Sequence, residues 1–526
     1  MTAQPQTQTQ TQTQTQTQTL RPYQERIVGE LRALSSSTNT TIPTTHGVVI
    51  PYGGGKTWTV VEAARQHALA QGRSLGMIFL CKSRAVNTIT TELEKRLPAY
   101  FRSGRYPYSP IVVMKGNHAQ RYGALCEAAA KSDRGWPWIL VIPYPSLRLD
   151  HALLCDLVER GKLDPGFCVA DESTTIKNPK SQVSKAAHRL ARALHDSCTQ
   201  GTYRCVILTG NMMPEGWHEI WSQLAFALPP ARLAQYGPTY YAFMRKFFLK
   251  TDRGWALPES NHARLDKLLT EDISWLFTEE LTTIRTSAGY PLAFATQEHY
   301  SLHPLQIRAL DQLMEEWTLY VRQGDGATAP ALEEYNFIIQ LVSKAQQICS
   351  GFTYTSASEV NLIVPCEDDP KLKLFVTLIQ DLLQENPQRK FVVWVAYRWE
   401  HVLIKSALDK LNIPSISGAD TAAAPQIFAD VPDLRVITMP IQCGQSLNEL
   451  AVADTGIFYS QTPSVEQRQQ AEARINRPNN PNLSIRHIDL IADNSREATI
   501  LAIMEAKRWT PADVLATLKE KEKAKE

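Results

Sequence analysis

Short apolar runs alternate with longer amphipathic stretches over residues 20–235. Runs that are apolar at every position are typical of strands buried on both faces of a parallel sheet, and the amphipathic stretches predict helices that cover it. The alternation therefore predicts an α/β lobe. Its strand-like runs are Gly47–Pro51, Met77–Cys81, Ile111–Met114, Ile139–Ile142, Phe167–Ala170 and Val206–Leu208.

The same pattern returns over residues 368–495, where it predicts a second α/β lobe. The strand-like runs there are Phe391–Val395, Leu434–Met439, Thr455–Tyr459 and Ile485–Ile491. Residues 236–367 lie between the two lobes and have helical periodicity, many aromatic side chains and few apolar runs. We therefore expect a helical connector in this region, with most of its aromatic side chains in the core.

The two ends of the chain have different compositions. Residues 1–19 are largely alternating Gln and Thr with almost nothing to bury, so we expect a disordered tail. Residues 496–526 predict a helix followed by a Lys/Glu-rich, solvated tail.

Composition narrows the class of protein. A chain of 526 residues, 43% of them hydrophobic, exceeds the size of a single core. The formal net charge is only +2, so binding to nucleic acid would depend on local patches. Nine cysteines without metal-ligand spacing indicate reduced thiols and predict no metal cage. With no run of bilayer length, we expect no membrane partner and a cytoplasmic protein.

A glycine-rich turn follows the first apolar run and carries Gly53, Gly54, Gly55, Lys56 and Thr57. Glycines allow backbone N–H groups to point at phosphate oxygens, the lysine reaches the outer phosphates, and the hydroxyl can bind Mg²⁺. The spacing lacks the first glycine of the usual loop, because Ile50 stands there. The turn predicts a nucleotide site.

Two adjacent acids, Asp171 and Glu172, follow the apolar run Phe167–Ala170. Acids in this position commonly cap a helix. After a phosphate loop in the same lobe, an ATPase is the more economical interpretation, with Asp171 near Mg²⁺ and Glu172 near the attacking water.

Two arginines of the second lobe, Arg474 and Arg477, lie on one side of a predicted helix. Such arginines usually form surface ion pairs. A phosphate site in the first lobe, however, needs a cation for the charge that develops on the γ-phosphate, and this pair would supply it.

These motifs, in this order, resemble the superfamily-two helicases and, within them, the Swi/Snf-like translocases. The resemblance extends from about residue 20 to residue 507. In the first lobe it is carried by Leu20–Gln24, Pro51–Thr57, Asp171–Asn178 and Leu208–Trp221. In the second lobe it is carried by Val393–Tyr397, Cys443–Asn448 and Gln470–Arg477.

The resemblance implies a fold of two tandem RecA-like lobes and roles for further residues. Gln24 would sense adenine, and Thr209, Gly210 and Gln470 would couple hydrolysis to movement. Contacts to nucleic acid are implied for Lys82, Ser83, Tyr144, Ser146, Thr438 and Asn448. Four positions depart from the family pattern and bear on coupling more than on hydrolysis: Asn211, Cys443, Ser446 and Glu449.

The implied function is that of an ATP- and Mg²⁺-dependent DNA translocase or helicase. The Lys177-Asn178 pair favours double-stranded DNA over RNA as the partner. An RNA helicase is one alternative. A nucleotide-gated binding or loading module without processive movement is the other. The departures in and next to the glycine-rich fifth motif of the family, Cys443–Asn448, keep this alternative open.

Overall fold

The computed structural model describes most of the chain. The described residues are 20–33, 45–50, 54–97, 108–197, 204–213, 216–251, 254–275, 291–323, 340, 342–356, 359–443, 449–462, 464–477 and 480–493. The predicted tails, residues 1–19 and 496–526, lie entirely outside the described residues.

The first lobe is built on a seven-stranded sheet in which every pair of neighbouring strands is parallel. Its order is β3 (Ile111–Val113), β4 (Trp138–Pro143), β2 (Gly76–Cys81), β5 (Phe167–Asp171), β6 (Arg204–Thr209), β1 (Gly47–Val49) and β9 (Ile273–Trp275). All six strands predicted for this lobe are present, and the seventh, β9, comes from beyond the predicted lobe boundary.

Helices cover both faces of this sheet. On one face lie α1 (Pro22–Arg32), α2 (Lys56–Ala70) and α3 (Val86–Arg96). The other face is covered by α5 (His118–Asp133), α6 (Tyr144–Glu159), α7 (Gln182–Ser197) and α8 (Ile220–Ala227). In β2, Met77 and Phe79 pack into the first core while Ile78 and Leu80 pack into the second. The strands are apolar throughout because each face has its own core.

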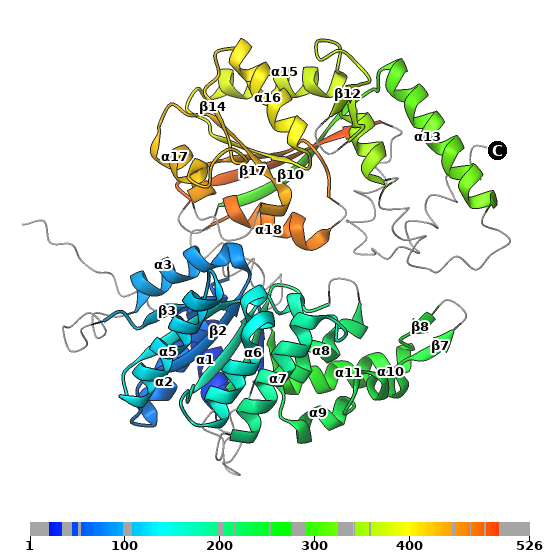
Figure 1. The fold of residues 1–526 in the computed structure, drawn as a ribbon. Coiled ribbons are helices and arrows are strands. Elements are labelled where there is room, and N and C mark those ends of the chain that lie inside the picture. Colours follow the sequence, from blue (N-terminus) through cyan, green and yellow to red (C-terminus); the bar gives the residue numbers. More distant parts are fainter. Residues whose placement is uncertain are drawn as a thin grey trace, which may run out of the picture.

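The second lobe contains a six-stranded sheet, also parallel throughout, in the order β10 (Leu292–Tyr300), β17 (Ser484–Ala492), β16 (Thr455–Phe458), β13 (Phe391–Val395), β15 (Val436–Pro440) and β14 (Ser415–Ser417). Helices α15 (Pro370–Glu385) and α16 (Arg398–Lys410) cover one face. Helices α17 (Ala424–Asp430) and α18 (Val465–Ile475) cover the other. Figure 1 shows the two lobes, with α18 on the side of the second lobe that faces α3. The predicted two-lobe α/β fold is confirmed.

The expectation of a helical connector over residues 236–367 is only partly met, because the region contains strands. Its helices include α10 (Tyr240–Phe247), α11 (Glu259–Asp272) and α13 (Pro304–Gln323). Its strands are β7 (Leu249–Thr251), β8 (Gly254–Ala256), β9, β10, β11 (Phe352–Tyr354) and β12 (Val360–Leu362).

Two of these strands are outer strands of the large sheets. Within the described part of the chain, strand β9 pairs only with β1, and β10 pairs only with β17. Strand β10 is exposed along most of its length, so its sequence lacks the continuous apolar run of a buried strand. The domain boundaries remain a prediction.

Candidate nucleotide site and nucleic-acid interface

The glycine-rich turn connects β1 to the N-terminus of α2. The Ile50 N–H donates to the Thr209 carbonyl at 3.1 Å, which holds the turn beside the end of β6. Gly55 has φ +80, in the left-handed region that favours glycine. Lys56 follows, buried, and its Nζ donates to the Ile50 carbonyl at 3.2 Å. Thr57 is half-buried in the first turn of α2, and Gly53 lies outside the described residues.

Helix α1 lies against the same turn. The Tyr23 hydroxyl donates to the Gly54 carbonyl at 2.6 Å, and Gln24 Nε2 reaches the Gly55 carbonyl at 3.5 Å. A Cβ at Gly55 would stand 2.7 Å from Gln24 Nε2, so a side chain there would displace the Gln24 amide from this contact. The structure therefore brings the predicted adenine-sensing glutamine to the phosphate loop.

The two acids stand at the carboxyl end of β5. Asp171 is buried, and its carbonyl accepts a hydrogen bond from the Tyr144 hydroxyl at 2.8 Å. Glu172 has φ 48 and ψ 58, a left-handed conformation that costs a non-glycine residue free energy. Burial and the neighbouring Glu172 carboxylate raise the pKa of Asp171 to about 7, against the opposing effects of Lys56 and Lys82.

Charges from both lobes act on Lys56. Burial lowers the pKa of its ammonium, and the Glu172 and Asp171 carboxylates oppose that change. Arg474 and Arg477 lower the pKa of Lys56 further, which places both guanidinium groups within electrostatic reach of the phosphate loop. Five predicted residues, remote in sequence, are thus brought together.

The residues present suit Mg²⁺. Glu172 Oε2 is buried, and it has no hydrogen-bond partner among the described residues. The Asp171 carboxylate and the Thr57 hydroxyl are hard oxygen donors of the kind that Mg²⁺ prefers. Within the described part of the chain there is no group of three or more His, Cys, Asp or Glu that could hold a metal ion by itself.

Helix α18 carries Arg474 and one contact between the lobes, and Arg477 lies just beyond its last residue, Ile475. The Ser464 hydroxyl caps its N-terminus by accepting from the Gln467 N–H. Glu466 accepts from Gln470 Nε2 at 2.9 Å and pairs with Lys82 Nζ of the first lobe at 3.5 Å. Lys82, predicted to contact nucleic acid, and Gln470, predicted to couple hydrolysis to movement, therefore both contact the Glu466 carboxylate.

The loop after β6 is linked to the acid pair through a residue that the sequence reasoning missed. Gln223 of α8 is fully buried. Its Oε1 accepts from the Ser173 hydroxyl at 2.6 Å, and its Nε2 donates to the Met212 carbonyl at 2.8 Å. The available signal was a glutamine inside the apolar stretch Ile220–Ala227, since a buried amide needs partners.

The predicted coupling residues Thr209 and Gly210 begin this loop. The Thr209 hydroxyl donates to the Asn211 carbonyl at 2.8 Å, and Asn211 Oδ1 accepts from the Met213 N–H at 3.0 Å. Asn211, which departs from the family pattern, thus stabilises the turn locally. Lys177 Nζ lies 2.5 Å from Glu219 Oε1, which ties the segment after the acids to the residues before α8.

The predicted nucleic-acid contacts fall in different environments. Lys82 is half-buried, and Ser83 is exposed beside Arg84, whose Nη1 lies 3.4 Å from the Gln442 carbonyl in the second lobe. Tyr144 is buried beneath Asp171, while Ser146 is half-buried.

In the second lobe, Thr438 is buried, and its hydroxyl lies 2.7 Å from Nδ1 of His401. Asn448 lies outside the described residues. The structure thus leaves Ser83 and Ser146 accessible, whereas Lys82 is paired with Glu466 and the hydroxyl groups of Tyr144 and Thr438 already have protein partners.

No described helix is long and apolar enough to span a membrane. No family model matches the sequence. Among curated proteins, p41 of Acyrthosiphon pisum secondary endosymbiont phage 1 is 26% identical over 373 residues, which cover 68% of this chain and 73% of that protein.

The chain is similar to several solved helicase-type cores. The Sulfolobus solfataricus SWI2/SNF2 ATPase core in complex with dsDNA has a TM-score of 0.40 and 18% identity, covering 93% of this chain and 91% of that chain. The same core without DNA has a TM-score of 0.39 and 16% identity, covering 93% and 89%. The Pyrococcus furiosus Hef helicase domain has a TM-score of 0.49 and 14% identity, covering 92% and 97%.

With TM-scores below 0.5, these likenesses carry no argument about activity. The chain itself has two parallel, helix-flanked sheets, which is the two-lobe α/β fold that the motifs predict.

Proposed function

We propose that this chain is an ATPase that is stimulated by nucleic acid and couples ATP hydrolysis to movement along double-stranded DNA. One observation carries the proposal. The ammonium of Lys56 is influenced both by the acid pair of its own lobe and by Arg474 and Arg477 of the other lobe. An arrangement in which cations from two lobes meet a carboxylate pair suits a polyphosphate bound between them.

Each group has a distinct role in this proposal. Lys56 and the N–H groups of the glycine turn bind the outer phosphates, and Thr57 and Asp171 hold Mg²⁺. When bound, Mg²⁺ neutralises phosphate charge. Glu172 takes a proton from the attacking water, and its Oε2 has no competing hydrogen bond among the described residues.

The second lobe contributes charge that depends on closure. Arg474 and Arg477 stabilise negative charge on the γ-phosphate only while the lobes are together. ATP therefore favours the closed arrangement, and loss of the γ-phosphate removes the differential contact that holds it. Ser173 and Gln223 connect the acid pair to the loop after Thr209, which supports a coupling role for that loop.

We propose that the protein moves along duplex DNA, because the Lys177-Asn178 pair is characteristic of the Swi/Snf-like branch. Hydroxyl groups and lysines such as Ser83 and Lys82 contact phosphates without reading bases, which suits movement along any sequence. Binding should therefore be independent of sequence. The logarithm of the binding constant should fall with the logarithm of salt concentration by roughly 0.9 per phosphate neutralised on a duplex.

The decisive experiment is the ATPase rate measured without nucleic acid and with single-stranded DNA, double-stranded DNA or RNA of equal length. We expect DNA to stimulate more strongly than RNA, with the duplex at least as effective as the single strand. Strongest stimulation by RNA would favour the RNA helicase. An ATPase rate that does not change when nucleic acid is added would contradict the proposed motor.

A second candidate, a nucleotide-gated loading module, is favoured by the fifth motif, where Cys443 and Ser446 replace glycines. Displacement of a triplex-forming strand during ATP hydrolysis separates the two candidates. A motor displaces the third strand, whereas a loading module hydrolyses ATP and leaves it in place.

A further inference from the structure

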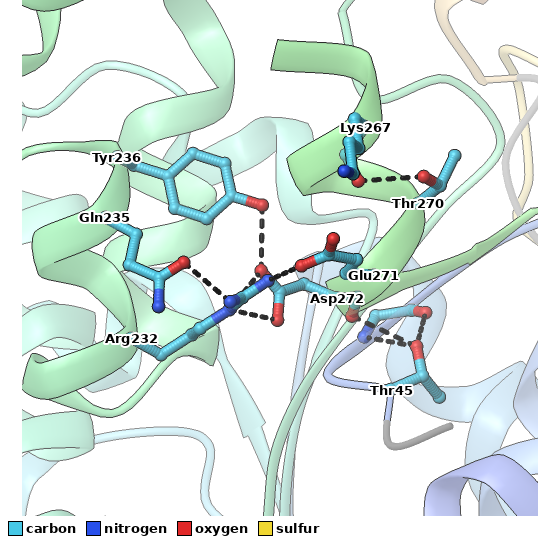
Figure 2. A network of polar contacts seen from close by, with 9 residues as sticks. Thr45, Arg232, Gln235, Tyr236, Lys267, Thr270, Glu271 and Asp272 are labelled. Carbon is cyan, nitrogen blue, oxygen red and sulfur yellow. Dashed lines mark hydrogen bonds and ion pairs between the residues drawn. The ribbon is translucent and has the colours of Figure 1, made fainter. Parts of the chain in front are cut away.

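Residues 230–275 form an extension of the first lobe whose two ends are joined (Figure 2). Arg232, from α9 (Pro230–Tyr236), donates through Nε to both carboxylate oxygens of Asp272 at 2.8 and 2.9 Å, and the Tyr236 hydroxyl donates to Oδ2 at 2.8 Å. Arg232 also pairs with Glu271 at 2.8 Å. The carbonyl of Asp272 accepts from the Thr45 hydroxyl at 3.1 Å, which ties the extension to the start of β1.

The middle of the extension is also held firmly against the lobe. Phe243 and Phe247 of α10 are buried in the core shared with α6 to α8, as the sequence predicted for these aromatics. Trp221 Nε1 donates to the Gly237 carbonyl at 2.8 Å, and Asn261 Nδ2 donates to the Phe247 carbonyl at 2.8 Å. The extension is therefore packed and hydrogen-bonded against the first lobe.

The outward side of this extension exposes aromatic and apolar side chains, which are exceptions to the expectation that most aromatics of this region are core. Tyr241 is 56% exposed, Trp255 39% and Leu249 60%. The rings of Tyr241 and Trp255 stand edge to face with centroids 6.4 Å apart. Arg245 lies over Tyr241 with Cζ 4.4 Å from the ring centroid. We call Tyr241, Arg245, Lys246, Leu249, Lys250 and Trp255 the α10–β7–β8 surface.

The described residues of this surface carry positive charges that form no ion pairs, although Lys246 Nζ donates to the Gln235 carbonyl at 2.5 Å. Among the described residues, none of Arg245, Lys246, Lys250 and Arg264 forms an ion pair, although 20 salt bridges occur elsewhere. Partial burial and the nearby Arg264 both lower the pKa of Lys246. Cations in the last turn of α10 suit its dipole, but Lys250 and Arg264 lie on other elements.

Exposed aromatic rings interleaved with unpaired cations match the chemistry of single-stranded nucleic acid. Unstacked bases gain by stacking on rings or guanidinium planes, and phosphates pair with the neighbouring cations. A blunt duplex offers its phosphates but keeps its bases stacked. Because Arg245 covers one face of Tyr241, a base would stack on Trp255 or on the guanidinium plane.

We infer that the α10–β7–β8 surface is a binding site for single-stranded nucleic acid, separate from the proposed duplex track. Figure 1 shows β7 and β8 at the end of the first lobe opposite α3 and α5. The inference goes beyond the proposed function, because strand binding here requires neither ATP hydrolysis nor closure of the lobes.

The test is equilibrium binding of the full chain, without nucleotide, to labelled oligo-dT, oligo-U and a blunt duplex. The variant is Tyr241→Ala with Trp255→Ala. Its control is Tyr122→Ala, which removes a 51% exposed tyrosine from α5. Stacking on aromatic rings predicts that the double variant binds single strands about tenfold or more weakly. Duplex binding and the melting temperature should be unchanged.

A second variant tests the charges. Lys250→Gln should make the salt dependence of single-strand binding shallower by about 0.7 in log–log slope, because one phosphate is no longer neutralised. Its control is Lys405→Gln on α16, where the lysine is paired with Asp409. Comparison of oligo-dT with oligo-U assigns the strand to DNA or RNA.

Single-strand affinity that is unchanged in the double variant overturns the inference, and so does an equal reduction of affinity for single strands and duplex. Neither result depends on the ATPase rate, so this inference and the proposed motor can fail separately.

Discussion

The carboxyl edges of the two parallel sheets both carry buried charged groups, but the two sets are satisfied differently. In the second lobe, Glu400 Oε1 accepts from the Ser350 hydroxyl at 2.9 Å and from the Ser460 hydroxyl. Its Oε2 accepts from the Tyr397 N–H at 3.1 Å. Lys371 Nζ donates to the same Ser350 hydroxyl at 3.2 Å.

In the first lobe the carboxylates have fewer partners. Glu172 Oε2 is buried without a hydrogen bond among the described residues, while its backbone adopts a left-handed conformation. The pKa of Asp171 is raised to about 7 by burial and by Glu172. Unlike Glu400, this pair is not saturated by the protein.

The difference separates structural charge from functional charge. A buried carboxylate whose oxygens are all occupied by hydroxyl and amide donors stabilises a fold and leaves no position for a ligand. A pair with an unoccupied oxygen and backbone strain is typical of a site completed by substrate, whereas a raised pKa does not distinguish the two edges, because burial raises the pKa of Glu400 as well. Position at the carboxyl edge of a sheet does not by itself distinguish the two.

The largest expected effect is on turnover in the first lobe. Glu172→Gln should lower the ATPase rate by about 10²- to 10⁴-fold, because an amide keeps the shape but cannot take a proton from water. ATP affinity and the free energy of unfolding should change little. Lys56→Ala should abolish hydrolysis. For both variants, filter binding measures the bound nucleotide and phosphate release measures the ATPase rate. A Glu172→Gln enzyme with wild-type turnover contradicts the assignment.

The matching change in the second lobe should act on stability instead. Glu400→Ala removes one of the two carboxylates, Glu400 and Asp369, whose charges act on the buried Lys371 ammonium, and it also removes the acceptor of the Ser350 and Ser460 hydroxyls, which together should lower the free energy of unfolding by about 3–5 kcal/mol. Urea unfolding measures this change. Turnover per folded molecule should remain within a few-fold of wild type. If Glu400→Ala reduced turnover while the free energy of unfolding stayed unchanged, the distinction between a structural and a functional carboxyl edge would be contradicted.

Helix α18 and the residues just after it allow the same comparison within one segment. Arg477→Ala and, to a similar or lesser degree, Arg474→Ala should lower turnover by up to about 10³-fold with little change in ATP affinity. The control is Arg468→Ala, because Arg468 pairs with Asp489 in the core. That variant should lose stability rather than turnover. If both Arg474 and Arg477 variants keep full turnover, the two residues do not take part in hydrolysis.

The smallest effect concerns the adenine-sensing motif. Gln24→Ala should weaken ATP binding by roughly tenfold, the cost of about one hydrogen bond. Deleting residues 1–19 should leave binding unchanged, because this polar repeat has nothing to pack. Extending the deletion through Gln24 should weaken binding to the same degree, as measured by titration with a fluorescent ATP analogue. Equal affinity in the two truncations would remove Gln24 from the site.

The sequence determined the parts of this protein that depend on local pattern. A strand buried on both faces must be apolar at each position, so the ten apolar strand runs were visible without a structure. The glycine turn, the acid pair and the arginine pair were visible because each chemistry needs particular residue types at short spacing.

Tertiary structure alone decided which distant groups meet. Strands β9, β10 and β14 were missed, because β10 and β14 are partly exposed and need no continuous apolar run, and β9 has three residues of which the buried Ser274 is polar. Gln223 became a link between Ser173 and Met212 only when α8 packed beneath both loops. Burial and pairing arise from contacts between segments far apart in the chain, and periodicity along one segment carries no record of its partner.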